Sequence, residues 1–145
     1  MQVLPRVIPV LLLEGDRFVK TLKFEEPVYV GDPVNVLSIF NDFEVDEMLL
    51  VDIGAAKQRA PIQFDRLAQF AAEAFVPLAY AGGLERLEDA ERLIRIGYEK
   101  VVFNTALIER PEVVREAVKV LGSQAVIAGL DLAVRDGKIC VVTHS

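Results

Sequence analysis

The sequence predicts an α/β fold with a parallel sheet, built as four βα units, a fifth strand and a terminal hairpin within a single domain of residues 1–145. Short β-rich runs alternate with segments of helical period along the chain, which is typical of strands joined by crossover helices. Hydrophobic residues form 52% of the chain and charged residues 26%. This apolar excess indicates strands buried on both faces, apolar surface kept for a partner, or both.

The first unit opens with an apolar strand over residues 7–13. Gly15 and its two acidic neighbours then turn the chain into a second extended piece, residues 17–24, which we expect to form a hairpin. Asp32 starts the first helix, because aspartate is a favoured N-cap and Pro33 suits the first helical position. This helix ends at about residue 43.

The following units repeat this alternation. Apolar runs that end in a polar or small residue predict three strands, at residues 47–53, 77–81 and 100–104. Amphipathic segments predict three helices, at residues 62–74, 87–96 and 111–121. Gly97 and Gly122 suit the ends of the last two helices. A fifth strand over residues 125–131 and a hairpin around Asp136 and Gly137 complete the prediction.

These strands are too few to close a ring, because a barrel of parallel strands needs about eight. The first and fifth strands would then carry unpaired backbone donors and acceptors along the edges of the sheet. We therefore expect a homodimer through these edges, or a complex with a complementary half. The pattern also fits a piece of a longer gene product, since Ser145 follows the hairpin without another helix.

Composition excludes several classes of function. The net charge of -6 and the absence of long Lys and Arg clusters argue against nucleic-acid binding. The apolar runs are far shorter than the roughly 20 residues that span a bilayer, and no secretory leader is recognisable, so we expect a cytoplasmic protein. A single cysteine, Cys140, and a single histidine, His144, exclude a disulfide and a Cys/His metal centre within the chain, and no cofactor is expected.

Small and polar residues follow the predicted strands at their carboxyl ends, where parallel α/β folds bind ligands. Gly82 and Gly83 allow a close backbone approach to an anion, with a helix N-terminus behind them, while Asn104 and Thr105 offer hydrogen-bond donors. These residues predict a phosphate site. A glycine pair is also compatible with a simple tight turn. Asp52 ends the second strand as an inward carboxylate, either structural or close to a substrate.

Three charged residues lie at the opposite, amino-terminal ends of the strands. Arg6, Glu47 and Lys100 precede or begin the first, second and fourth strands, which places them in a ring. Such a ring is either functional or an ordinary ion-pair network, because residues at this end of a barrel more often serve stability.

Several segments together resemble the cyclase subunit of imidazole glycerol phosphate synthase, a family of histidine biosynthesis. They are Arg6-Val7-Ile8-Pro9 with Lys20, Gly31-Asp32-Pro33, Asp46-Glu47 through Asp52-Ile53, Ala81-Gly82-Gly83, Lys100 through Asn104-Thr105, and Gly122-Ser123-Gln124-Ala125-Val126 through Asp131. Their order and spacing match along the whole chain, and the second half of the family's barrel is absent. The resemblance implies the (βα)4 half of a TIM barrel, on the scaffold of a lyase.

The resemblance also implies roles for individual residues. It assigns Gly83, Asn104 and Thr105 to one phosphate of the substrate. It places Asp131, at the end of the fifth strand, at one of two catalytic aspartates, whereas the partner position holds Leu12. Because an isobutyl group cannot transfer a proton, ordinary cyclase activity is not expected. Asp131 is otherwise a cap or a partner of Lys20, and Lys20 is a second catalytic candidate if it reaches over the strand ends.

For the charged ring, the resemblance implies an ammonia gate that receives ammonia from a glutaminase subunit. Three shorter stretches, residues 19–24, 29–33 and 39–41, resemble cyclase-like proteins associated with acetamidino modification of surface sugars. Two hypotheses result. The first is a dimeric half-barrel that binds phosphorylated small molecules and has little or no turnover alone. The second is a cyclase-like partner that docks a glutaminase and conducts ammonia to a sugar amidotransferase.

Overall fold

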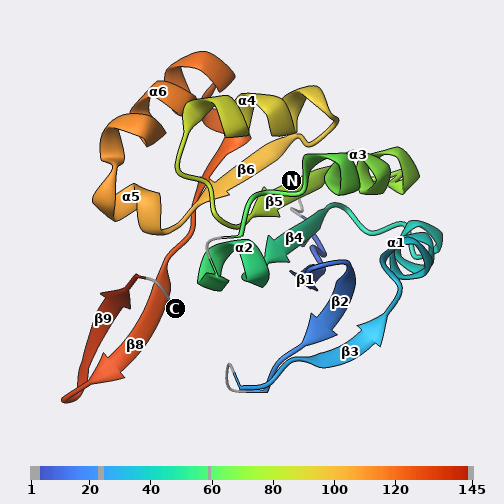
Figure 1. The fold of residues 1–145 in the computed structure, drawn as a ribbon, viewed down its shortest axis with the longest axis horizontal. Helices are drawn as coiled ribbons and strands as arrows, with labels where there is room; N and C mark the ends of the chain where they lie inside the picture. The colour runs from blue at the N-terminus through green and yellow to red at the C-terminus, as the bar shows by residue number, and fades with distance from the viewer. Residues whose placement is uncertain (1–3, 23–24, 59, 144–145) are drawn as a thin grey trace.

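The computed structural model describes residues 4–22, 25–58 and 60–143 (Figure 1). Seven strands form one sheet in the order β3-β2-β1-β4-β5-β6-β7. Their bounds are β1 Val10–Glu14, β2 Arg17–Lys20, β3 Val28–Gly31, β4 Met48–Asp52, β5 Leu78–Ala81, β6 Lys100–Phe103 and β7 Val126–Ala128. β1, β4, β5, β6 and β7 are parallel neighbours, whereas β2 and β3 pair antiparallel beside β1. The predicted α/β class with a mainly parallel sheet is confirmed.

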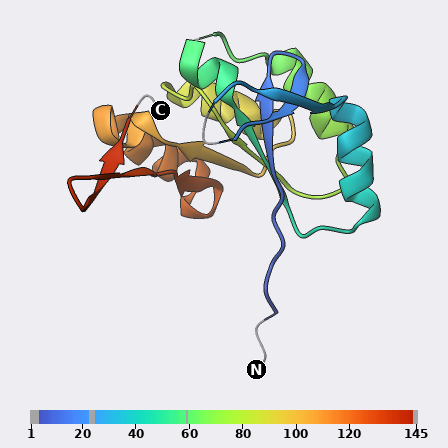
Figure 2. The ribbon, with the colours of Figure 1, turned by 90° about the horizontal axis from the view of Figure 1, so that it is seen from below.

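The helices that connect the parallel strands lie along the sheet (Figures 1 and 2). The helical segments are α1 Pro33–Asp42, α2 Ile53–Gln58, α3 Phe64–Glu73, α4 Leu87–Arg95, α5 Thr105–Glu109, α6 Pro111–Leu121 and the short 3-10 turn Ser123–Ala125. Asp32 caps α1 as predicted, since its carboxylate accepts a hydrogen bond from Asn35 N at 3.3 Å. Within the described residues, no helix has the length and apolar character needed to cross a bilayer.

The core lies between the helices and one face of the sheet. Leu50, Tyr80 and Phe103 project from neighbouring strands into a buried cluster that includes Leu67 of α3 and Leu93 of α4. Alternate residues of β1 and β4 point to the opposite face and are half-buried or exposed. The sheet therefore has one fully packed face and one open face, on which the side chains of β1 and β4 are only partly covered.

The first strand begins later than predicted because of Pro9. Residues 7–9 already run beside β4, where Pro9 O accepts a hydrogen bond from Leu49 N at 2.9 Å. Pro9 has no N–H to donate, so the β1–β4 ladder starts at Val10. The expectation that the first strand forms an open edge is wrong, because β2 pairs with its other side. The outer strands of the described sheet are β3 and β7.

Sequence reasoning misses β3, α2 and α5. All three are short, and α2 and α5 follow a strand without any intervening residue or after a single one. The helical period of such segments is too brief to separate from the end of a strand. β3 forms because residues 17–20 turn back and offer a second edge to the chain. The elements that were missed therefore depend on neighbours rather than on their own sequence pattern.

The chain after β6 departs from the prediction in one important respect. β7 ends at Ala128, and Gly129 N then donates a hydrogen bond to Phe103 O at 2.8 Å, which holds the chain against the tip of β6. Asp131 consequently begins a new strand, β8 (Asp131–Arg135), and the prediction that it ends the fifth strand is wrong. β8 pairs with β9 (Lys138–Val142) in the predicted hairpin, which projects from the sheet (Figures 1 and 2).

Candidate functional site

A pocket of about 210 Å³ opens at the carboxyl ends of the parallel strands. Gly82 and Gly83 from the end of β5 line it together with Asn104 and Thr105 from the end of β6. The two pairs meet because β5 and β6 are parallel neighbours in the sheet. The four residues predicted to bind phosphate therefore share one rim, which is the geometric condition for a joint anion site.

The glycine pair is required by close packing of the backbone. The φ angle is +141° at Gly82 and +60° at Gly83, values that favour glycine. A Cβ atom on Gly82 would lie 2.6 Å from Asp52 O, and one on Gly83 would lie 3.2 Å from Ala55 Cβ. These contacts bring the end of β5 against the turn that follows β4. Backbone conformation and close packing therefore explain why glycine occupies both positions, whether or not a ligand binds there.

Asp131 reaches the pocket from the start of β8 rather than from the end of a sheet strand. Asn104 Nδ2 donates a hydrogen bond to Asp131 Oδ2 at 2.8 Å, so the amide of one predicted phosphate ligand holds the candidate acid. An amide nitrogen carries two hydrogens, and one of them is not used in this bond. Leu12 lines the same pocket. Leu12 and Asp131, the two positions at which the resemblance implies catalytic aspartates, therefore line one pocket, and only Asp131 carries a carboxylate.

One predicted site residue, Lys20, lies outside the pocket. Lys20 ends β2 with an exposed side chain, and Thr21 rather than Lys20 lines the pocket. No ion pair between Lys20 and Asp131 is present in the described part of the chain. The third predicted helix begins where expected, because α4 starts at Leu87, three residues beyond the pocket residue Leu84.

Asp52 has a structural role below the pocket. Its carboxylate accepts a hydrogen bond from Ala55 N at 2.8 Å in the first turn of α2, and Tyr80 Oη donates to its other oxygen at 3.3 Å. Burial raises the pKa of the Asp52 carboxyl above its ordinary value, and the hydrogen bonds from Ala55, Tyr80 and Gly54 partly oppose this shift. Asp52 thereby fixes the turn that brings Ala55 and Ala56 to the pocket wall.

Replacement of Asp52 by asparagine is expected to change how stability depends on pH. Because the folded-state pKa lies above the ordinary value of 3.8, the folded chain binds more protons than the unfolded chain between these two values. The Asp52 contribution to stability therefore falls as pH rises through that window. Urea unfolding of both proteins at several pH values from about 3.5 to 7 is expected to show the stability difference moving in favour of Asp52→Asn, then levelling off. A constant difference would contradict the raised pKa.

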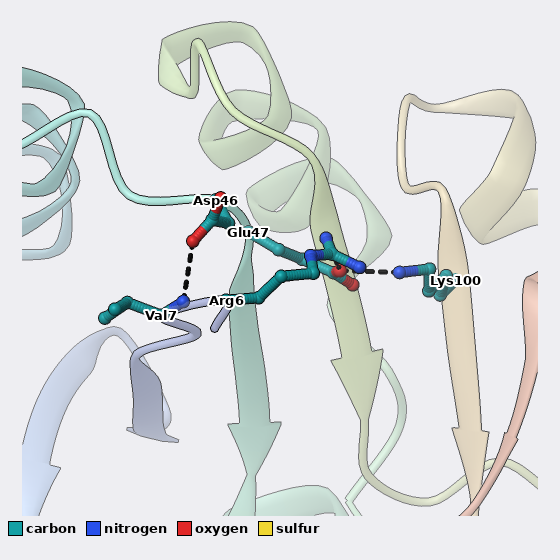
Figure 3. Close-up of polar contacts among 5 residues, drawn as sticks. All are labelled: Arg6, Val7, Asp46, Glu47 and Lys100. Atoms are coloured by element: carbon teal, nitrogen blue, oxygen red, sulfur yellow. Dashed lines mark hydrogen bonds and ion pairs between the residues drawn. The ribbon is translucent and has the colours of Figure 1, made fainter. Parts of the chain in front are cut away.

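The three charged residues at the amino-terminal ends form one ion-pair cluster (Figure 3). Glu47 Oε2 accepts hydrogen bonds from Arg6 Nη2 at 2.9 Å and from Lys100 Nζ at 2.5 Å. The Glu47 side chain is 3% exposed, compared with 54% for Arg6 and 23% for Lys100. Asp46 Oδ2 also accepts a hydrogen bond from Val7 N at 2.6 Å, which anchors the segment that carries Arg6. The sequence correctly predicts that the three charges come together.

Other pocket residues have no recognisable signal in the sequence. Glu85 lines the rim of the pocket and forms an ion pair with Arg110 at 3.2 Å. Aliphatic side chains line the floor of the pocket. These residues could be found only from the strand register, because their types are common throughout the chain. In the part of the chain that the structure describes, His, Cys, Asp and Glu nowhere gather in a group of three or more that could hold a metal ion. His144 lies outside the described residues.

The parallel sheet, its helices and the pocket at the strand ends define this chain as a partial TIM-barrel-like α/β protein with a pocket at the carboxyl-terminal rim. The chain belongs to the histidine biosynthesis protein family, which matches residues 6–144. The predicted relationship to the cyclase subunit of imidazole glycerol phosphate synthase is supported by the names of its relatives.

Three relatives illustrate this similarity. The putative imidazole glycerol phosphate synthase subunit hisF2 of Pseudomonas aeruginosa is 44% identical over 126 residues, covering 87% of this chain and 50% of the relative. The putative subunit hisF3 of Vibrio vulnificus is 40% identical over 130 residues, covering 90% and 50%. The imidazole glycerol phosphate synthase subunit HisF of Exiguobacterium is 34% identical over 139 residues, covering 96% and 54%. The chain spans about half the length of these curated relatives.

Proposed function

We propose that this chain is a half-barrel that binds phosphorylated small molecules at the carboxyl-terminal rim of its sheet. The main support for this proposal is that one pocket is lined by Gly82, Gly83, Asn104 and Thr105. Backbone N–H groups exposed by glycine, a primary amide and a hydroxyl are all donors to phosphate oxygens. The names of the relatives refer to a phosphorylated compound, which supports the same ligand class.

The charges around the pocket define what kind of phosphate site this is. Among the described residues that line the pocket there is no Lys or Arg, whereas Glu85 and Asp131 are present. Glu85 is paired with Arg110, so its charge is largely balanced. Asp131 is held by the neutral Asn104 amide and lies on the same rim as the proposed anion. The described donors at this rim are therefore neutral, and the Asp131 carboxylate places a negative charge next to the proposed anion.

Turnover of the cyclase type is not part of this proposal. A general acid and a general base on opposite sides of a substrate require two titratable groups. Leu12 supplies none, and Lys20 is exposed outside the pocket wall. Asp131 can hold or accept one proton, whereas Glu85, the other carboxylate of the described pocket wall, is paired with Arg110. We infer that the chain by itself binds its ligand and has little or no cyclase activity.

Titration with inorganic phosphate, monitored by backbone amide shifts, tests the proposal. We expect shifts concentrated at Gly83, Asn104 and Thr105. Asp131→Asn is expected to tighten binding by about three- to tenfold, because it removes a negative charge close to the anion while an oxygen remains to accept from Asn104. Thr105→Val, which replaces the hydroxyl by a methyl group of similar size, is expected to weaken binding. Silence at all three residues up to about 50 mM phosphate, well above the range of useful affinities, would contradict the proposal.

The same proposal includes a homodimer through the outer strands β3 and β7. Both outer strands have a backbone edge with no partner strand in the described sheet, and such edges favour pairing with another chain. Analytical ultracentrifugation measures this directly. A monomer that persists at protein concentrations of about 100 μM would remove the dimer from the proposal.

A second function is supported by the Glu47 cluster. The three charges converge at the amino-terminal end of the open sheet face, opposite the phosphate pocket. In this alternative, the chain docks a glutaminase at that end and conducts ammonia through the Arg6, Glu47 and Lys100 gate toward a sugar acetamidino modification. A glutaminase that neither co-purifies with the chain nor hydrolyses glutamine faster in its presence would exclude this function.

A further inference from the structure

The floor of the rim pocket is one row of aliphatic side chains that crosses four strands. Leu12 of β1 is the register partner of Val51 in β4, Val51 is the partner of Ala81 in β5, and Ala81 is the partner of Val102 in β6. Register partners in a sheet point to the same face, and all four residues line the pocket. The row is therefore a continuous apolar strip, not a scatter of separate side chains.

The polar groups of the pocket lie at one end of this strip. Gly82, Gly83, Asn104 and Thr105 follow β5 and β6, next to Ala81 and Val102 in the chain. The other end, over β1 and β4, is lined by Leu12 and Val51, with Ile53 beyond them. Thr21 is the polar residue that the described part of the chain adds there. A bound molecule that places an anionic group at the β5–β6 end would extend its remaining atoms over aliphatic carbon.

A polyhydroxylated body is a poor match for that surface. Each hydroxyl that loses water against Leu12 or Val51 without gaining a partner carries a desolvation penalty, whereas an apolar group gains from the same contact. Leu12 has no polar atom in its side chain to receive a hydroxyl. The chemistry of the strip therefore discriminates between ligands that share the same phosphate.

We propose that the pocket selects phosphate monoesters whose organic group is apolar, such as an aryl or alkyl phosphate, and that Leu12 is a specificity-determining residue. This inference rests on the proposed phosphate site, because the anionic group fixes which end of the ligand lies over the strip. It names the ligand class that the phosphate site alone leaves open.

Three probes separate the two proposals: inorganic phosphate, phenyl phosphate and glycerol 3-phosphate, with affinities measured by calorimetry and amide shifts. Phenyl phosphate is expected to bind at least tenfold more tightly than glycerol 3-phosphate, because a few buried aromatic carbons suffice for that factor. Leu12→Asn, which is similar in size but polar, is expected to remove most of this preference while inorganic phosphate binds as before. Val51→Thr, an isosteric change within the strip, is also expected to reduce the preference for phenyl phosphate over glycerol 3-phosphate.

Val10→Thr is the matched control. Val10 lies on the same strand and face as Leu12 but is 57% exposed and does not line the pocket, so its substitution is expected to leave the preference intact. Equal affinity for both esters, with inorganic phosphate still bound, would overturn this inference and leave the proposed function standing. Absence of inorganic phosphate and ester binding at the rim would overturn both. A preference that survives Leu12→Asn and Val51→Thr would overturn the role of the strip.

Discussion

Replacement of Glu47 by alanine is expected to destabilise the fold by about 3 kcal/mol, because it leaves Lys100 largely buried beside the sheet without its counter-charge. The Glu47 side chain is 3% exposed and accepts hydrogen bonds from both Arg6 and Lys100. Removal of one member of a buried pair costs more than the pair contributes, since the remaining charge keeps its desolvation penalty. Urea unfolding at pH 7, with the linear dependence on denaturant checked, gives the change in free energy.

Two matched variants show which part of the cluster causes the effect. Arg6→Ala is expected to cost less than about 1 kcal/mol, because the Arg6 side chain is 54% exposed and water replaces its contact. The double variant Glu47→Leu with Lys100→Met is expected to recover most of the lost stability, because it replaces both charges by side chains of similar volume. If Glu47→Ala costs no more than Arg6→Ala, the cluster is not a buried network and its structural role is refuted.

Replacement of Gly82 by alanine is expected to destabilise the chain by about 3 kcal/mol or more, through steric conflict between backbone atoms. The new Cβ would lie 2.6 Å from Asp52 O and 2.8 Å from Asp52 Cβ, and neither atom is the end of a flexible side chain. The φ angle of +141° adds strain for any residue with a Cβ. To relieve this steric conflict, the end of β5 must move away from the end of β4, and this movement changes the shape of the pocket. We therefore expect loss of phosphate binding together with a lower unfolding midpoint.

Gly15→Ala is the control for this experiment. Gly15 also has a positive φ angle, +61°, but apart from its chain neighbours no atom of the described residues lies within 4 Å of the position of its Cβ. Its substitution is expected to cost about 1 kcal/mol from backbone strain alone and to leave phosphate binding unchanged. If both variants lose the same amount of stability, the close approach of β5 to β4 is not the reason why residue 82 must be glycine.

Local signals predicted most of the regular elements. Asp32 and Pro33 mark the start of α1, Gly97 and Gly122 follow α4 and α6, and Asp136-Gly137 forms the turn of the terminal hairpin with positive φ angles at both residues. Each of these features depends on a backbone preference or a hydrogen bond within a few residues of chain. These preferences depend on residues that are close together in the sequence, so they can be predicted from the sequence alone.

Edges and short connections were less predictable. Pro9 delays β1 only because β4 lies beside it, and β3 exists only because β2 offers an edge. Asp131 was expected at the end of a sheet strand, yet Gly129 turns the chain at β6 first. The residue at which a strand ends depends on the neighbouring strand with which it pairs, and a single sequence does not show which strand that is.

The sequence by itself determined the succession of the longer strands and helices, the family resemblance, and the residue types available at each strand end. The tertiary structure decided which of these residues face one another: Asn104 with Asp131, Glu47 with Arg6 and Lys100, and Leu12 in one row with Val51, Ala81 and Val102. The physical reason is that side chains alternate between two faces of a strand. A shift of one residue in register would send each of them to the other side of the sheet.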